Sequence, residues 1–154
     1  MLILKFIHLL SLVIWIGGIV FFSFVAAPAI FKTLPRAQAG DVVAKIFPIY
    51  YKIAYVCGPL SLGTLLGVSI QKASSPVWNF LCIALMTVLT FYSGIVIGRK
   101  VRQLKKERNA ASTDVIQQEK EKAFKKLHGI SMALNMLVLM IGMILIFLTS
   151  LNLQ

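Results

Sequence analysis

The sequence predicts an all-α integral membrane protein, a bundle of four transmembrane helices. The 154 residues are 58% hydrophobic and only 14% charged, whereas about a quarter of a soluble domain is charged. Four stretches contain no Lys, Arg, Asp or Glu and together cover 99 residues, so all 21 charged residues lie in the other 55. A chain this small could not bury so many apolar side chains away from water. These observations exclude a soluble globular domain and a disordered chain.

Each charge-free stretch is long enough, or nearly so, for a helix to cross the apolar core of a bilayer, which takes about 20 residues. Helices are expected because the apolar runs do not alternate with polar residues, as the strands of a membrane β-barrel do. The predicted spans are 5–27, 53–71, 77–98 and 128–150. We expect the whole chain, 1–154, to form a single transmembrane domain.

The distribution of basic residues predicts how these helices are oriented. Of the 16 Lys and Arg residues, fourteen lie in segments 32–52 and 99–126, and only Lys5 and Lys72 lie on the other side. Short cytoplasmic loops carry the excess of basic residues. We therefore expect two cytoplasmic loops and both termini outside, as in a multi-pass cell-membrane protein of the bacterial inner-membrane type. Topology thus explains the net charge of +11, which does not predict nucleic-acid binding.

Both cytoplasmic loops are predicted to contain helices. Residues 41–50 carry apolar side chains at helical spacing, which predicts a short helix in the headgroup region, broken near Pro48. Residues 99–127 predict a charged helical hairpin. Its ten basic residues, against four acidic ones, would contact anionic lipid headgroups at roughly 1 kcal/mol per basic residue near the surface.

The predicted spans contain two histidines and no acidic residue. Each histidine opens a polar stripe, with further polar residues three and seven positions later on the same helix face. These faces either form a functional polar pocket or pack against neighbouring helices through hydrogen bonds. Because the two helices run in opposite directions, the imidazoles should lie about 20–25 Å apart in depth and cannot share one metal. The pocket candidates are His8, Ser11, Trp15, His128, Ser131 and Asn135.

A second candidate site combines soft metal ligands. Counted along straight helices, His8, Cys82, Met86 and Met143 should lie at similar depths. Imidazole, thiolate and thioether groups suit Cu(I), and His with Met ligates haem. The alternative is that methionine fills gaps in the core. Copper or haem is therefore one hypothesis for a cofactor.

Small-residue motifs occur in the second and third spans. Gly63-x-x-x-Gly67 and Gly94-x-x-x-Gly98 allow helices to approach closely, either within one chain or between copies in a homo-oligomer. The predicted depth of Gly58 in the membrane is closer to that of Gly94 and Gly98 than the depth of Gly63 and Gly67 is. The proline that follows Gly58 is expected to kink the second helix.

No CxxC, HExxH, GxSxG or P-loop motif is present in the sequence, so common hydrolase and nucleotidase chemistry has no support. The favoured interpretation is a small polytopic membrane protein without a catalytic site, acting as a transport, binding or accessory factor. Two alternatives stay open. One is a haem- or copper-handling protein, an oxidoreductase included, that uses His8, and the other is an oligomeric channel assembled through the glycine motifs.

Several motifs suggest a family. The first span and its loop read His8-x6-Trp15-x-Gly17-Gly18-x2-Phe21-Phe22, Pro28-x2-Phe31-x2-Leu34-Pro35-Arg36, Gly40 and Phe47-Pro48-x-Tyr50, and the last span begins His128-Gly129-x-Ser131-x3-Asn135. This pattern resembles the transmembrane-protein-205-like family, four-span membrane proteins of unknown function, and covers most of the chain outside the charged loop. The resemblance implies a fold more than an activity.

A weaker similarity links the chain to copper-resistance D-like proteins and to membrane protoporphyrinogen oxidases, which bind haem. Those groups tend to carry a histidine and a tryptophan early in the first span, as His8 and Trp15 do here. The chain lacks the further inward-facing histidines that such a resemblance leads one to expect.

Overall fold

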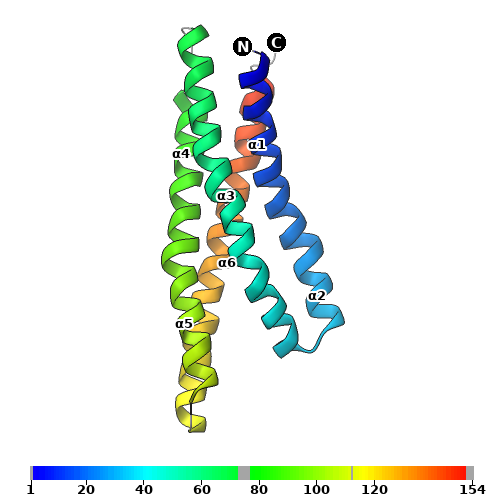
Figure 1. Cartoon of the computed structure of the whole chain (residues 1–154), viewed down its shortest axis with the longest axis vertical. Helices are drawn as coiled ribbons and strands as arrows, with labels where there is room; N and C mark the ends of the chain where they lie inside the picture. Colours follow the sequence, from blue (N-terminus) through cyan, green and yellow to red (C-terminus); the bar gives the residue numbers. More distant parts are fainter. Residues whose placement is uncertain (1, 73–76, 112, 152–154) are drawn as a thin grey trace.

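The computed structural model describes residues 2–72, 77–111 and 113–151, and these contain helices and no strand. The described residues form four long helical rods, which run up and down, and the two termini lie at one end (Figure 1). Each rod is long and apolar enough to cross a membrane. The predicted all-α bundle of four membrane helices is therefore confirmed. The connection predicted between the second and third spans lies at 73–76, outside the described residues.

The first rod consists of α1 (Leu2–Phe21), a π-helical segment η1 (Phe22–Ala26) and α2 (Ala27–Thr33). Pro28, in the first turn of α2, has no N–H to donate, and the π-helical turn before it lets the rod continue. The rod ends at Leu34, whose backbone is extended. The following proline explains this, because it excludes the preceding residue from the helical conformation.

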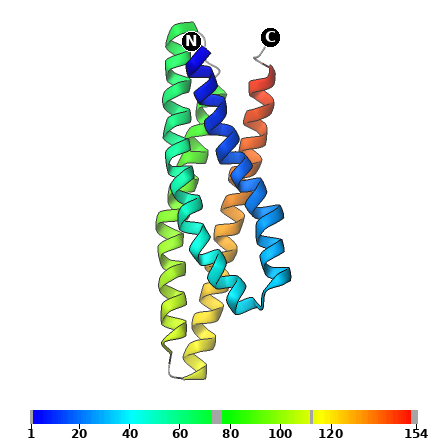
Figure 2. The same ribbon diagram turned by 45° about the vertical axis from the view of Figure 1, so that its right-hand side comes forward.

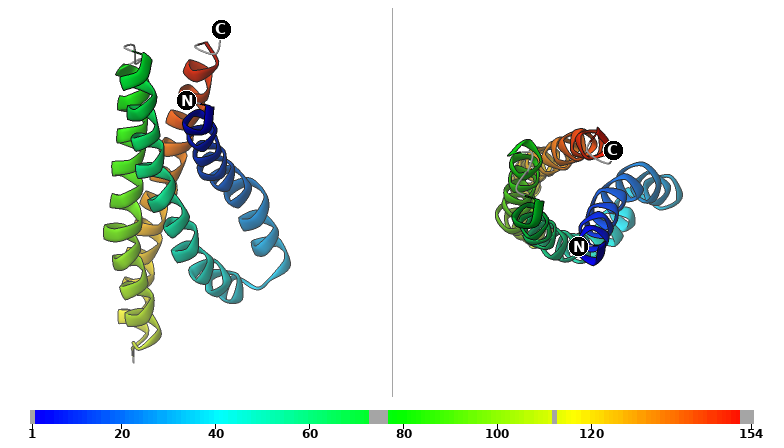
Figure 3. Two further views of the ribbon diagram at one scale, coloured as in Figure 1. Left: turned by 45° about the horizontal axis from the view of Figure 1, so that its top comes forward. Right: turned by 90° about the horizontal axis from the view of Figure 1, so that it is seen from above.

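The second rod is a single helix, α3 (Arg36–Lys72), which runs through both Pro48 and Pro59. The separate helix expected over 41–50, with a break near Pro48, is therefore not found. The physical reason is tertiary packing on both sides of that proline. The Phe22 ring lies with its centroid 5.1 Å from that of Phe47 and 5.8 Å from that of Tyr50. Figure 3 shows that α3 bends along its length instead of breaking.

The third rod consists of α4 (Val77–Phe91), a second π-helical segment η2 (Tyr92–Ile97) and α5 (Gly98–Asn109). The fourth is α6 (Asp114–Leu151). The α5 helix and the first turns of α6 lie side by side at the end of the bundle opposite the termini (Figure 2). We call this end the loop end and the other the termini end.

Ion pairs connect the two arms of this hairpin. Arg108 Nη1 lies 2.7 Å from Glu121 Oε2, and Lys120 Nζ lies 2.7 Å from Glu107 Oε2. The charge-rich stretch that follows the third predicted span is thus folded against the start of the last helix and does not form an open loop.

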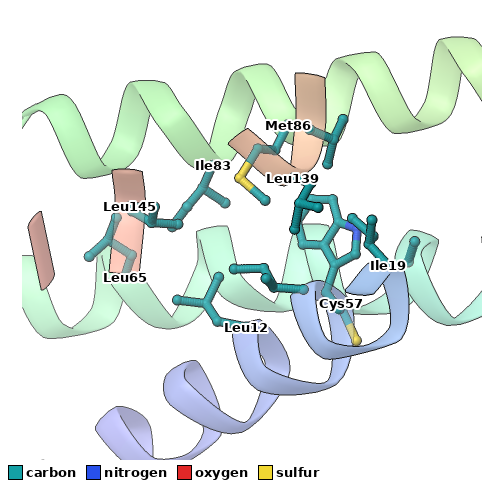
Figure 4. Close-up of a cluster of buried hydrophobic side chains, with 12 residues drawn as sticks. Leu12, Ile19, Cys57, Leu65, Ile83, Met86, Leu139 and Leu145 are labelled. Atoms are coloured by element: carbon teal, nitrogen blue, oxygen red, sulfur yellow. The ribbon is translucent and has the colours of Figure 1, made fainter. Parts of the chain in front are cut away.

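The helices follow one another around the bundle, so that α3 contacts α1 and α4, and α4 contacts α3 and α6. Figure 3 shows this arrangement from above. A cluster of buried apolar side chains fills the middle, with Ile83, Met86 and Leu145 fully buried (Figure 4). Apolar side chains also cover the outside, and Val13, Phe24 and Phe147 are each more than half exposed. Such a surface fits lipid acyl chains and not water.

The glycines divide into two kinds. A Cβ atom on Gly58 would lie 2.9 Å from Thr87 Oγ1, and one on Gly94 would lie 2.7 Å from the Tyr51 ring. Both glycines therefore let α3 and the α4–η2 rod approach closely. Gly67 lies against Leu4 of α1. Gly63 faces outward, and no neighbouring atom of the described residues lies within 4 Å of the place its Cβ would take. The two members of the Gly63-x-x-x-Gly67 motif are thus in different surroundings.

Candidate functional site

The six predicted pocket residues do not meet in one pocket. His8 and Ser11 pair with α3 near the termini end, while Ser131 and Asn135 pair with the tyrosines of α3 toward the loop end. Trp15 lies between them in the apolar core. We describe the two polar groups separately, as the histidine cluster and the tyrosine cluster.

The histidine cluster consists of His8, Ser11, Ser61 and Thr64. His8 Nδ1 lies 3.1 Å from both the Ser61 carbonyl oxygen and Thr64 Oγ1. Ser11 Oγ donates to the His8 carbonyl at 2.8 Å and lies 2.7 Å from Ser61 Oγ. A carbonyl oxygen only accepts, so this network assigns the proton of the neutral imidazole to Nδ1. Only 8% of His8 is exposed, and the cluster joins α1 to α3.

Trp15 is 2% exposed and its indole Nε1 has no hydrogen-bond partner among the described residues. Its ring edge lies close to Gly58, with Cη2 3.3 Å from the place a Cβ would take there. The tryptophan therefore fills the space that the glycine leaves open between α1 and α3. It is a core residue in this structure, on the same helix face as His8.

The tyrosine cluster consists of Tyr50, Tyr51, Ser93, Ser131 and Asn135. Tyr51 Oη lies 2.8 Å from Ser93 Oγ and 3.3 Å from Ser131 Oγ. Tyr50 Oη donates to Asn135 Oδ1 at 3.4 Å. Ser93 belongs to the π-helical segment η2, a kind of turn that is frequent at functional sites.

Five residues of these clusters were not among the predicted site residues. They are Tyr50, Tyr51, Ser61, Thr64 and Ser93. One signal was available for two of them, because Ser61 and Thr64 repeat on α3 the three-residue spacing of His8 and Ser11. The spacing of residues in the sequence shows which of them share a helix face, but it does not show which neighbouring helix that face contacts.

A groove of about 840 Å³ opens at the loop end, next to the tyrosine cluster. We call it the basic groove. Its walls come from α2, the first turns of α3, α5 and the start of α6. Its volume is in the range of small-molecule sites. Polar residues of the tyrosine cluster and His128 also line it, as do the apolar side chains of Phe31, Val43, Phe47, Val101 and Phe124.

His128 lies in an aromatic environment within this groove. Its ring stacks on Phe124 with centroids 5.8 Å apart, and it meets Phe47 edge-on at 6.4 Å. Phe47 in turn stacks on Tyr51 at 6.0 Å. The second predicted histidine therefore belongs to the groove wall, in contrast to the buried, hydrogen-bonded His8.

Eight charged residues line the groove, six of them basic and two acidic. Three of the basic residues form ion pairs. Lys105 Nζ lies 2.6 Å from Asp41 Oδ1. Glu121 pairs with two cations, because its Oε2 lies 2.7 Å from Arg108 Nη1 and its Oε1 lies 3.4 Å from Lys125 Nζ. The hydrogen bond from Arg108 holds the pKa of Glu121 below its usual value. The charged lining residues are Arg36, Arg102, Lys105, Arg108, Asp114, Glu121, Lys122 and Lys125.

The structure does not bring the predicted soft-metal residues together. Met86 is fully buried and its Cε lies 3.2 Å from the Cβ position of Gly142, which also faces Ile16. Met86 is thus level with Ile16, eight residues or about 12 Å along α1 from His8. Met143 is 56% exposed on the outer surface.

The described residues contain no group of three His, Cys, Asp or Glu side chains placed to hold a metal ion. Haem or copper binding at His8 stays a prediction. An absorption spectrum and a metal analysis of the purified protein test it.

Comparisons with known proteins place the chain in a family. Residues 10–110, which include Ser11, Ser61, Ser93 and Arg102, match the family described as a domain of unknown function, DUF4149. An uncharacterized protein of Aquifex aeolicus (strain VF5) is 31% identical over 134 residues, which cover 86% of this chain and 85% of that protein. No solved structure shows a significant match. The chain is a member of the DUF4149 family, and its four helices, long and apolar enough to span a membrane, indicate a multi-pass membrane protein.

Proposed function

We propose that the protein is a non-catalytic binding, transport or accessory factor that takes up an amphipathic molecule in the basic groove. The observation that carries the proposal is the composition of that groove. Aromatic and aliphatic side chains line it beside an excess of basic residues. Small-molecule sites are typically apolar cavities with a few polar groups that orient the ligand.

The geometry of the polar clusters supports binding over catalysis. Nucleophilic catalysis needs a nucleophile beside a base that a third group orients. Among the described residues, the side chains of the serines in the tyrosine cluster bond only to each other and to a tyrosine hydroxyl. His8 is held by a backbone carbonyl and by a threonine that itself donates to a carbonyl.

The charge distribution supports an orientation with the loop end in the cytoplasm and both termini outside. The groove and the hairpin carry most of the basic residues, and cytoplasmic loops of membrane proteins are enriched in Lys and Arg. In this orientation the groove lies at the inner surface of the cell membrane, where anionic headgroups would contact the segment 99–126. A cysteine placed at Lys106 should react with an impermeant maleimide in inside-out vesicles and not in whole cells.

A variant that fills the groove tests the proposed function. Ala44 lines the groove, whereas Ile49 on the same helix is 61% exposed outside it. Protein purified in a mild detergent should retain about one amphipathic molecule per chain, measured by mass spectrometry of the extract. Ala44→Trp should lose this molecule and Ile49→Trp should keep it. Equal retention in both variants, or no stoichiometric ligand in the wild type, would contradict the proposal.

A second candidate, a homo-oligomer, rests on Gly63. This glycine faces outward with open space around it, so a neighbouring helix could approach closely there. Gly63→Leu should then shift the detergent-corrected mass to that of a monomer. An unchanged mass would remove this candidate. Gly67 is unsuitable for the same test because it already packs on Leu4.

We propose that the chain belongs with the transmembrane-protein-205-like proteins, because motif residues at both ends of the resemblance have structural roles. His8 joins α1 to α3, Trp15 fills the gap at Gly58, and Ser131 bonds to Tyr51. An alignment of family members in which these positions vary freely would argue against this subgroup.

A further inference from the structure

The third rod presents a row of cations to the basic groove. Arg102, Lys105 and Arg108 follow one another at three-residue spacing and all line the groove. Lys105 is neutralised by Asp41, and Arg108 by Glu121. Arg102, the residue of the row closest to the apolar part of the rod, has no hydrogen bond or ion pair within the described parts of the chain.

The guanidinium of Arg102 points toward the membrane part of the rod. Its Nη1 lies 3.3 Å from the place where a Cβ of Gly98 would be, and Gly98 is the last residue of the charge-free stretch. Long basic side chains near helix ends usually extend away from the apolar layer. Here the missing Cβ lets the charge lie one turn deeper, beside the tyrosine cluster.

Among the described residues, no acidic side chain forms an ion pair with this charge. Asp114 is the one acidic lining residue that makes no ion pair among the described residues. It begins α6 after the end of α5 at Asn109, which is seven residues or about 10 Å beyond Arg102. Arg36 and Lys122 also line the groove, and neither forms an ion pair within the part of the chain that the structure describes. The groove therefore has an excess of positive charge at the end of an apolar wall.

We propose that the basic groove binds an anionic lipid by its phosphate, with the Arg102 guanidinium contacting the phosphate and the acyl chain lying along Phe31, Val43 and Phe47. A guanidinium forms paired hydrogen bonds to phosphate oxygens. The unpaired cations of the lining match a phosphate monoester, which carries more than one negative charge near neutral pH. This inference rests on the proposed function, because it names the ligand of the same groove.

The test uses the full-length protein in a maltoside detergent and radiolabelled dodecyl phosphate as the probe, measured by scintillation proximity. Unlabelled dodecanol has the same chain without charge, and dodecanoate carries a carboxylate. Arg102→Gln should weaken dodecyl phosphate binding about tenfold or more, because a hydrogen bond to a charged group is lost. Lys106→Gln, one turn further along α5 and outside the groove lining, should change it less than about twofold.

A second variant, at Gly98, keeps the charge of Arg102 but changes the position of its guanidinium. Gly98→Leu should displace the guanidinium and weaken dodecyl phosphate binding as Arg102→Gln does, whereas Arg102→Lys should have an intermediate effect. The melting temperature of each variant, measured without probe, establishes that it is folded. If Arg102→Gln is unstable, Gly98→Leu alone decides the question.

The outcomes separate this inference from the proposed function. If dodecanol competes as well as dodecyl phosphate, or both the Arg102→Gln and Gly98→Leu proteins bind the probe like wild type, the phosphate assignment is wrong while groove binding stands. Stronger binding of dodecanoate would replace phosphate by a carboxylate. If none of the three chains binds saturably, and Ala44→Trp changes nothing, both proposals fail.

Discussion

The two histidines of the chain lie in different surroundings, and the regions around them have different structures. His8 near the termini end is buried, and its Nδ1 lies between two oxygens of α3. His128 near the loop end lies in the wall of an 840 Å³ groove between aromatic rings. Similar polar stripes thus serve helix packing at one end and line a cavity at the other.

The difference follows from how the helices diverge. Toward the termini end α1 lies along α3, so polar groups on their facing sides meet directly. Toward the loop end the first turns of α3 and the hairpin of α5 and α6 stand on opposite sides of the groove (Figure 1). The Lys105–Asp41 ion pair spans this separation. A site for a ligand can form only where the elements stand apart.

The largest expected effect concerns the packed middle of the bundle. Met86→Ala should lower the free energy of unfolding by about 3 kcal/mol, because it empties space in a fully buried cluster. Met143→Ala, at an exposed position, should change it by less than about 0.5 kcal/mol. Unfolding in mixed micelles with increasing dodecyl sulfate measures both. Equal losses would indicate that Met143 has a partner, such as a bound metal, that its exposure conceals.

The second-largest expected effect is that of a substitution at Gly94. It tests whether the tyrosine cluster, which borders the groove, is as closely packed as the core. A Cβ at Gly94 would meet Tyr51 and Tyr55, so Gly94→Ala should destabilise the protein by about 2 kcal/mol through overpacking. Gly63→Ala is the matched control, because no described residue has an atom within 4 Å of the new Cβ, and it should be neutral or slightly stabilising. A neutral Gly94→Ala would show that the tyrosines can move into the groove.

Replacing each histidine by alanine tests whether His8 contributes more to stability than His128. His8→Ala should cost about 1.5 kcal/mol, because a buried hydrogen bond and its packing are lost. His128→Ala should cost less than about 1 kcal/mol, since its ring faces the groove and loses only stacking. The same unfolding assay applies. A larger cost at His128 than at His8 would reverse the assignment of structural and groove roles.

The smallest effect concerns pH. The pKa of Glu121 is lowered mainly by the hydrogen bond from Arg108. A carboxylate with a lowered folded-state pKa stabilises the fold above its unfolded-state pKa of about 4.3, and this contribution disappears as the pH falls through the folded value. A partly exposed ion pair is worth about 0.5 kcal/mol. The difference in melting temperature between wild type and Glu121→Gln should therefore shrink from pH 6 to pH 3, and a constant difference would contradict this role.

The sequence predicted the helices better than the contacts between them. The four apolar spans could be located because a membrane helix needs a long run of uncharged residues, and that pattern is local. The predicted break near Pro48 was wrong, since packing of Phe22 on Phe47 and Tyr50 keeps α3 continuous. Depth counting also failed for Met86, which is level with Ile16 and not with His8.

By itself the sequence determined a four-helix membrane protein with its positive charge gathered in two segments, because helix length and charge are properties of consecutive residues. Tertiary structure decided which polar stripe is buried and which lines a groove. It also decided that, in the described parts of the chain, Lys105 and Arg108 have acidic partners while Arg102 has none. Those outcomes depend on the rotation and divergence of whole helices, which bring residues like Asp41 and Lys105 together across 64 positions of chain and which no local spacing specifies.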